Sequence, residues 1–252
     1  MYKNIDVKTL LMSEVKKRDS KDEISLDKPD PLFVASRYKE EYISLICAMY
    51  AYGNAKLIVK FLSSLDFSLL DSNEIQIREK LNDKYYRFQS IQDTQEIFIA
   101  LEKLKKISSL VEIFMRGYSR KNDVMDGIYK LIEAIYDINP YRSRGYEFLV
   151  GKVPKKNPTS PYKRWHMFLR WMVRDDNLDF GLWSDVNKKD LLMPLDTHTF
   201  KIGKKLGLIK RKTYDFKSVV ELTNSLKKFD SNDPIKFDFA LYRLGQEGLI
   251  HS

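Results

Sequence analysis

Apolar residues recur every three or four positions along most of this chain, the spacing that is typical of amphipathic helices. Residues 5–18 show it, with apolar side chains at Val7, Leu10, Leu11 and Val15. Residues 38–52 and 54–65 read as a helix pair separated at Gly53. The same spacing predicts helices over residues 66–81, 94–105, 109–118 and 123–138. Period-two alternation is rare, so the pattern predicts an all-α fold.

The pattern changes over residues 142–161. The stretch 153–161 holds three prolines and two lysines, which predicts an exposed basic loop. Ser160 is then the expected cap of a helix that begins at Pro161 and runs to residue 174. One face of that helix is apolar, and the other carries Lys163, Met167, Arg170 and Arg174. Two more helices are predicted over residues 215–229 and 233–245.

The composition is that of a folded globular protein with a basic surface. Hydrophobic residues make up 43% and charged residues 31%, which is too apolar for a disordered chain. The formal net charge is +9, and the pI is about 9.3. This excess favours an anionic partner, with nucleic acid first and a membrane surface second.

Several classes of protein are excluded by what the chain lacks. Cys47 is the only cysteine, so a disulfide framework, a cysteine-ligated zinc site and a four-cysteine iron–sulfur cluster are not expected. The histidines are scattered and make no metal-binding spacing, so we expect neither a metal nor another cofactor. No apolar run approaches the roughly 18 residues of a membrane span. A signal-peptide core is not visible either, so a cytoplasmic protein is expected.

The segment 194–208 carries the clearest candidate for chemistry. It reads Leu-Asp-Thr-His-Thr-Phe-Lys-Ile over residues 195–202 and ends in Leu-Gly-Leu over residues 206–208. Asp196 follows a proline at the predicted mouth of a short helix, where free backbone N–H groups and the helix dipole keep a carboxylate ionised. Such an aspartate can be a purely structural cap, or it can face a cation that forms during a reaction on nucleic acid.

This segment resembles the aspartate motif of the helix–hairpin–helix DNA glycosylases. In that superfamily the catalytic aspartate opens a helix, and a lysine lies at the start of the preceding long helix. Lys163, followed by Arg-Trp-His-Met-Phe-Leu, matches that helix in position and character. The order of motifs along nearly the whole chain is also similar to an uncharacterised bacterial group that resembles the superfamily.

Two departures from the common pattern of the superfamily limit the resemblance to one of its branches. The family's Leu-Pro-Gly-Val-Gly hairpin is replaced by residues 157–162, which contain no glycine. Lys163 and Asp196 are 33 residues apart, farther than in the common members. The archaeal 8-oxoguanine DNA glycosylases share a long separation and an unusual hairpin, and they are the branch that this chain most resembles.

The resemblance implies a two-lobed helical fold with a central cleft. Residues 38–174 would form one lobe, with the lysine helix, and residues 1–37 plus 175–252 the other, with the aspartate. The implied activity is base excision from double-stranded DNA with associated lyase activity, by a monomer. Lys163 and Asp196 are the implied catalytic pair. Candidate base-pocket residues are Trp165, Trp183, Asp238, Phe239 and Tyr242, and candidate DNA contacts are Tyr52, Asn54, Lys155, Lys156, Tyr162, Arg164 and Arg170.

Other readings of the same residues stay open. Trp165 belongs to an apolar stripe and is expected in the core more often than against a base, and Lys155 and Lys156 can be merely solvated. The alternative function is a DNA- or RNA-binding protein without catalysis, built on a degenerate glycosylase scaffold. The missing hairpin glycines favour that alternative, whereas the lysine–aspartate pair favours the enzyme.

Overall fold

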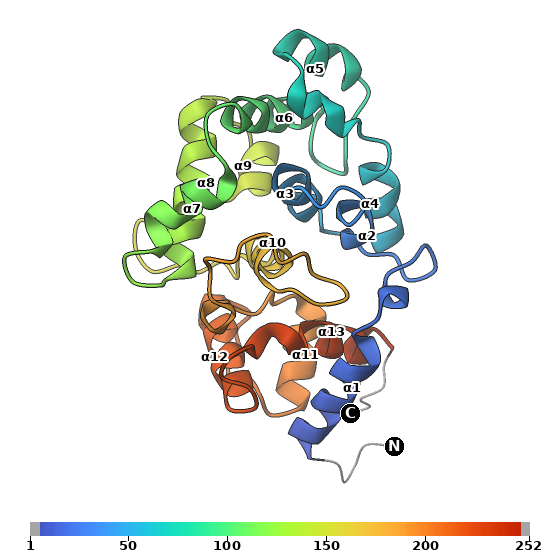
Figure 1. Cartoon of the computed structure of the whole chain (residues 1–252), viewed down its shortest axis with the longest axis vertical. Coiled ribbons are helices and arrows are strands. Elements are labelled where there is room, and N and C mark those ends of the chain that lie inside the picture. The colour runs from blue at the N-terminus through green and yellow to red at the C-terminus, as the bar shows by residue number, and fades with distance from the viewer. Residues whose placement is uncertain (1–5, 248–252) are drawn as a thin grey trace. The chain divides into compact units, whose positions relative to one another are not determined.

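The computed structural model describes residues 6–247, and the regular elements among them are helical (Figure 1). These are thirteen α-helices and four short 3₁₀ helices within that range. The described residues form no strand, and their β-bridges are isolated, joining Tyr86 to Gln89 and Asp175 to Phe180. The predicted all-α class is therefore confirmed. Across residues 6–247, no helix has the length and apolar character needed to cross a membrane.

The chain folds as two compact units, and both chain ends belong to the same unit. The terminal unit comprises Met1–Glu23 and Lys156–Ser252, and the middle unit comprises Ile24–Lys155. The predicted lobes were divided differently, because residues 24–37 fall in the middle unit and residues 156–174 in the terminal unit. The helix that begins at Lys163 is consequently in the same unit as Asp196.

The middle unit contains eight α-helices, most of which start at a side-chain N-cap. In α6 and α7, the side chains of Ser90 and Ser109 accept a hydrogen bond from a backbone N–H, and the carboxylates of Asp93 and Glu112 accept one from the N–H of the cap residue. The predicted helix over 66–81 is instead the 3₁₀ helix η2 (Phe67–Asp71) followed by α5. The helices are α2 (Leu32–Ala35), α3 (Glu41–Met49), α4 (Ala55–Leu62), α5 (Glu74–Lys80), α6 (Ile91–Lys105), α7 (Leu110–Tyr118), α8 (Val124–Ile138) and α9 (Arg144–Val150).

The core of the middle unit is formed around α3 and α6, which are buried on nearly all sides. Ile97 and Phe98 of α6 are fully buried, and so are Ile46 and Cys47 of α3. Cys47 is thus a core residue, as its apolar surroundings in the sequence predict. Burial raises the pKa of the Cys47 thiol well above its ordinary value, so this cysteine is neutral and inert.

The loop predicted over residues 153–161 is non-helical, whereas the segment just before it holds a helix that the sequence did not predict. Helix α9 begins after Ser143, whose hydroxyl accepts a hydrogen bond from the backbone N–H of Tyr146 at 2.9 Å. Tyr146, Leu149 and Val150 are buried and hold this short helix against the unit. Residues 151–162, which include Pro154, Pro158 and Pro161, follow α9 as a non-helical stretch.

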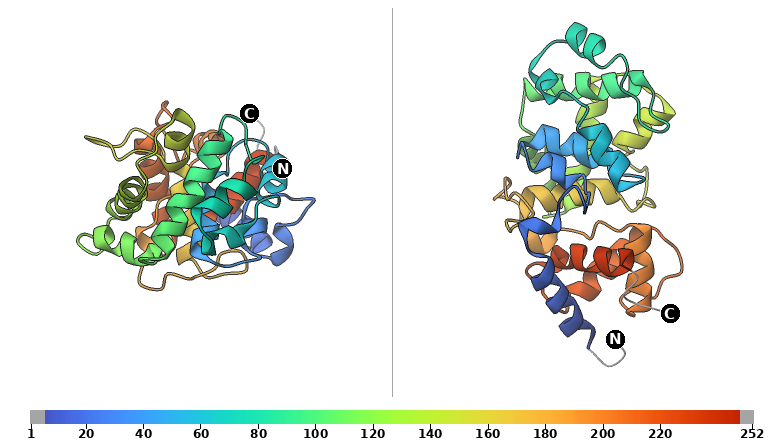
Figure 2. Two further views of the ribbon diagram at one scale, coloured as in Figure 1. Left: turned by 90° about the horizontal axis from the view of Figure 1, so that it is seen from above. Right: turned by 90° about the vertical axis from the view of Figure 1, so that its right-hand side faces the viewer.

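The terminal unit joins the first helix of the chain to the last. Helix α1 (Val7–Arg18) packs against α13 (Asp238–Gln246), as Figure 2 shows. Arg18 makes two 2.7 Å hydrogen bonds to the carboxylate of Glu247, and Arg243 of α13 bonds Glu23 at 2.6 Å. The guanidinium groups of both arginines are buried, so these pairs fix the docking of α1. The other helices of this unit are α10 (Lys163–Val173), α11 (Thr197–Lys205) and α12 (Phe216–Lys227).

Helices α7 and α8 approach each other closely at two glycines. A Cβ atom on Gly117 would lie 2.2 Å from the backbone oxygen of Asp126, and one on Gly127 would lie 2.4 Å from the Phe114 ring. Real Cβ atoms do not reach such distances, so the helices have this separation only because both residues are glycine.

We predict that Gly117→Ala destabilises the protein by about 2 kcal/mol, although alanine is the better helix former. The clash is with backbone atoms of α8, which cannot rotate away, so the two helices must separate. The midpoint of urea unfolding measures the loss. As a control, Gly207→Ala has open space around the new Cβ but a positive φ of 70°, and should cost only about 1 kcal/mol. A Gly117→Ala midpoint equal to that of the wild type would contradict the packing argument.

Candidate functional site

Lys163 is the first residue of α10, and the residue before it has an unusual backbone. Tyr162 is the N-cap with φ of 48° and ψ of 33°, in the left-handed region. The helix therefore starts at Lys163, and the prediction that Ser160 caps a helix beginning at Pro161 is wrong by two residues. The left-handed turn at Tyr162 separates the proline-rich segment from the helix axis, because continuous helix requires negative φ. Lys163 itself is half-buried.

Asp196 is the N-cap of α11, as the sequence predicts. Its carboxylate accepts a hydrogen bond from the backbone N–H of Thr199 at 2.7 Å, and it stays half-buried. The Tyr214 hydroxyl donates to the Leu195 carbonyl at 2.9 Å, which places this ring beside the cap. Partial burial raises the pKa of Tyr214 to about 12, and the negative charge of Asp196 adds to this effect. The carboxylate is thus a fixed anion at the mouth of a helix.

Asp238, at the start of α13, is a buried carboxyl whose pKa is influenced by both candidate catalytic groups. It is 8% exposed and makes an ion pair with Arg170 of α10. Burial raises the pKa of the Asp238 carboxyl, Arg170 opposes the rise, Asp196 adds to it, and Lys163 opposes it. Lys163 and Asp196 are therefore both close enough to Asp238 to influence its charge.

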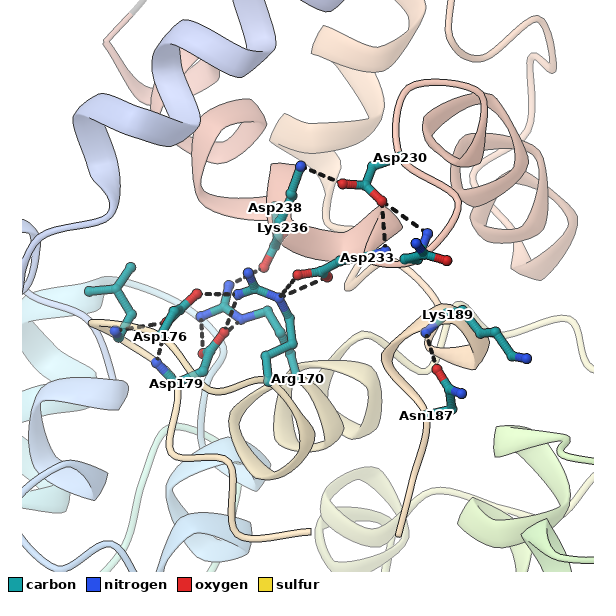
Figure 3. Close-up of polar contacts among 12 residues, drawn as sticks. Arg170, Asp176, Asp179, Asn187, Lys189, Asp230, Asp233, Lys236 and Asp238 are labelled. Atoms are coloured by element: carbon teal, nitrogen blue, oxygen red, sulfur yellow. Dashed lines mark hydrogen bonds and ion pairs between the residues drawn. The ribbon is translucent and has the colours of Figure 1, made fainter. Parts of the chain in front are cut away.

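Arg170 of α10 and Arg174, the C-cap of that helix, are four residues apart and pair with aspartates. Figure 3 shows Arg170 with the surrounding Asp176, Asp179, Asp233 and Asp238. Arg170 Nε donates to Asp179 at 3.1 Å. Arg174 contacts Asp179 and Asp176 at 2.6 Å each, and Asp233 at 3.0 Å. Both arginine side chains are buried. We refer to these two arginines with Asp176, Asp179, Asp233 and Asp238 as the arginine–aspartate cluster.

The cluster has more carboxylates than arginines, and its carboxyl groups respond differently to their surroundings. Burial raises the pKa of the Asp179 carboxyl to about 6, against the opposing effect of both arginines. For Asp176, burial is outweighed by Arg174 and by backbone N–H donors, so its pKa lies below the ordinary value. The members Asp176, Asp179 and Asp233 were not identified from the sequence. Two arginines at i and i+4 on a largely apolar helix were the available signal for them.

The predicted base-pocket aromatic residues fall into two groups. Trp165 and Trp183 are 5% and 2% exposed, and both pack edge-on to Phe168 in the core. Phe239 lies under the guanidinium of Arg170, with the Arg170 Cζ atom 4.5 Å from the ring centroid. Tyr242 is half-buried and edge-on to Phe239. Phe239 and Tyr242 therefore lie beside the arginine–aspartate cluster, whereas the two tryptophans serve the core.

The predicted DNA contacts are spread over both units. Arg170 is buried and paired with two carboxylates, so it is not available to a phosphate at the surface, and that prediction is corrected. Lys155 and Lys156 are exposed, and Arg164 is half-buried. In the middle unit, Asn54 caps α4 through bonds from the N–H groups of Lys56 and Leu57, and Tyr52 packs against Phe88 and Phe148.

His166 is a buried group that the sequence did not single out. It is 1% exposed, and neither ring nitrogen has a hydrogen-bond partner within the described part of the chain. Its ring stacks near Phe216 of α12, with 6.4 Å between centroids. Burial lowers the pKa of His166 to about 3, so the imidazole is neutral at pH 7. Groups of three or more potential metal ligands do not occur within residues 6–247.

Comparison with known proteins assigns the chain to a family without giving it an activity. The family model described as "Protein of unknown function (DUF2400)" matches residues 30–247. No curated protein and no solved structure matches the chain. The matched range contains Lys163, Asp196 and the whole arginine–aspartate cluster.

We predict that His166 makes stability pH-dependent on the acid side. A histidine whose folded pKa lies below its unfolded value of about 6.5 binds fewer protons when folded, so its stabilising effect is complete above that pH and is lost as the pH falls. Between about pH 6.5 and 5 the wild type should lose about 2 kcal/mol that His166→Leu does not lose. Urea unfolding across this range, with the exposed His198→Gln as control, measures the difference. Parallel curves for the wild type and His166→Leu would overturn this account.

Proposed function

Because the chain belongs to the DUF2400 family of proteins of unknown function, we propose an activity from its own site. The proposed function is that of a DNA glycosylase with associated lyase activity, which removes an oxidised purine such as 8-oxoguanine. The observation that carries the proposal is the Asp196 carboxylate, which the Thr199 N–H holds at the mouth of α11 at 2.7 Å, in the same unit as Lys163 at the start of α10. The resemblance of both segments to the helix–hairpin–helix glycosylases supports it, and a glycosylase-like two-lobed fold with a cleft is part of the proposal.

In the proposed reaction Asp196 stabilises the sugar while the base departs. Breaking the bond between C1′ and the base nitrogen leaves positive charge on the sugar, and the electron pair leaves with the base, which takes up a proton. A carboxylate held in place before the reaction stabilises that charge without reorganisation. Asp196 meets this requirement, since its position is fixed by the Thr199 N–H.

Lys163 supplies the nucleophile in the same scheme. Its neutral amine forms a bond to C1′, loses a proton, and the ring opens at the C1′–O4′ bond to give a Schiff base with a protonated O4′. The Schiff base activates the sugar for elimination of the 3′ phosphate, which is the lyase step. The position of Lys163 at the first turn of α10 supports this role, because the chain before it turns away at Tyr162.

Recognition of the base is assigned to groups beside the arginine–aspartate cluster. A base that reacts at C1′ has to be extruded from the duplex and held by stacking and by hydrogen bonds to its edge. Phe239 and Tyr242 offer aromatic surface, and the Asp238 carboxyl offers hydrogen bonding. The raised pKa of Asp238 increases the fraction of this carboxyl that can donate as well as accept.

The lysine role is tested by trapping with borohydride on a duplex that contains 8-oxoguanine. We expect wild type to form a reduced covalent adduct and Lys163→Gln to form none, because glutamine cannot form a Schiff base. Lys188→Gln, an exposed lysine of the same unit, is the control and should trap like wild type. An undiminished adduct with Lys163→Gln would exclude Lys163 as the nucleophile. Tight binding without adduct or base release in wild type would favour the non-catalytic alternative.

The aspartate role is tested with Asp196→Asn, which changes the charge but keeps a good N-cap. We expect stability to stay within about 1 kcal/mol, because asparagine caps helices as well as aspartate does. Base release should fall by a factor of about 10² to 10³. Asp215 caps α12 in the same way, through the Ser218 N–H at 3.0 Å, so Asp215→Asn is a matched control expected to retain activity. Equal loss in both variants would mean that only capping matters.

A further inference from the structure

Most of the net charge of the protein is concentrated in one short segment. Residues 197–217 contain seven lysines and arginines and one acidic residue, which gives a formal charge of +6, compared with +9 for the whole chain. This segment comprises α11, the following turn and the start of α12. Its one acidic residue, Asp215, is already paired with Arg211 at 2.6 Å. The segment is therefore strongly electropositive over a small length of chain.

The lysines of α11 share one exposed helix face. Lys201, Lys204 and Lys205 stand at i, i+3 and i+4, and all three are exposed. The opposite face, with Thr199, Ile202 and Gly203, is buried, and α11 packs against α13. We call the three lysines the α11 lysine face. Because the buried side of α11 packs against α13, the backbone that carries the three lysines is held in place.

This face is continuous with the cap that holds Asp196. The ammonium of Lys204 lies 5.7 Å from the centroid of the Phe200 ring, and that ring packs edge-on to Tyr214 at 5.7 Å. Tyr214 in turn bonds to the Leu195 carbonyl, next to Asp196. Contacts through Phe200 and Tyr214 therefore connect the α11 lysine face to the backbone beside Asp196.

We propose that the α11 lysine face is the anchor for the phosphate backbone of duplex DNA, next to the proposed site. This proposal rests on the proposed function only where it treats the neighbouring Asp196 as a catalytic residue. A charged row at regular spacing matches the regular negative charge along a duplex. An anionic membrane is the less suitable partner, because a helix that binds lipid needs a free apolar face, and that of α11 is already buried.

The test measures binding of a short undamaged DNA duplex, so it does not depend on base release. The variant Lys201→Gln/Lys204→Gln/Lys205→Gln removes three charges and keeps residues of similar helix propensity. We expect the slope of log affinity against log salt to become shallower by about 2.7, and affinity at ~0.1 M salt to fall at least about tenfold. Fluorescence anisotropy over ~50–200 mM salt gives both values.

Two matched variants complete the design. Lys8→Gln/Lys16→Gln/Lys17→Gln removes three exposed charges from α1 of the same unit and should bind nearly as wild type does. Replacing Lys201, Lys204 and Lys205 by arginine keeps the charges and should preserve binding. Equal losses in the α1 and α11 glutamine variants would overturn the proposal, because net charge alone would then explain the binding.

The remaining outcomes separate this proposal from the proposed function. If base release is absent but binding depends on the α11 lysines, the anchor is supported while the enzyme is not. If the protein releases the base but its DNA affinity does not depend on the α11 lysines, the proposed anchor is overturned while the proposed function is supported. Binding of the wild type to phosphatidylserine vesicles, lost in the α11 variant, with no binding to DNA, would also overturn it in favour of a membrane surface.

Discussion

The burial of two arginines on one helix is the constraint on which the terminal unit depends. A buried guanidinium without a partner would cost several kcal/mol, so Arg170 and Arg174 require carboxylates at hydrogen-bond distance. Those carboxylates come from two segments, the loop after α10 with Asp179 and the stretch 233–238 with Asp233 and Asp238. The loop after α10 and the start of α13 are therefore tied to α10 by charge. Any change in the approach of these segments would leave a charge unpaired, which makes the arrangement specific.

The same constraint orients the candidate site. Lys163 precedes Arg170 by seven residues, two helical turns, so it lies on the face of α10 that the ion pairs direct toward α13. Asp238 makes an ion pair with Arg170, and its pKa is influenced by Lys163 and Asp196. Helix α11, which begins at Asp196, packs against α13 as well. Because α10 and α11 both contact α13, this helix helps to set the positions of Lys163 and Asp196, although the two residues are far apart in sequence.

The local features were predictable from the sequence, and the long-range ones were not. Helical periodicity predicted the all-α class, and a proline, an aspartate and a Gly-Leu end predicted the capped helix at Asp196. Helix α9 was not predicted, because the prolines after residue 153 dominate the pattern of this part of the chain, although the buried residues of α9 follow helical spacing. The arginine–aspartate cluster was missed because Asp233 and Asp238 lie 59 and 68 residues from their arginines. Nothing local to an aspartate in a polar stretch indicates such a distant partner.

The excess of carboxylates over arginines explains why the cluster members differ in their pKa values. Four aspartates share two arginines, so the positive charge does not balance the negative charge when all four are ionised. Burial raises the pKa of Asp179 to about 6 and raises that of Asp238, whereas Arg174 and backbone N–H donors lower that of Asp176. A fall in pH below about 6 therefore protonates Asp179 before Asp176, and it weakens the pairing that holds the loop after α10 to this helix.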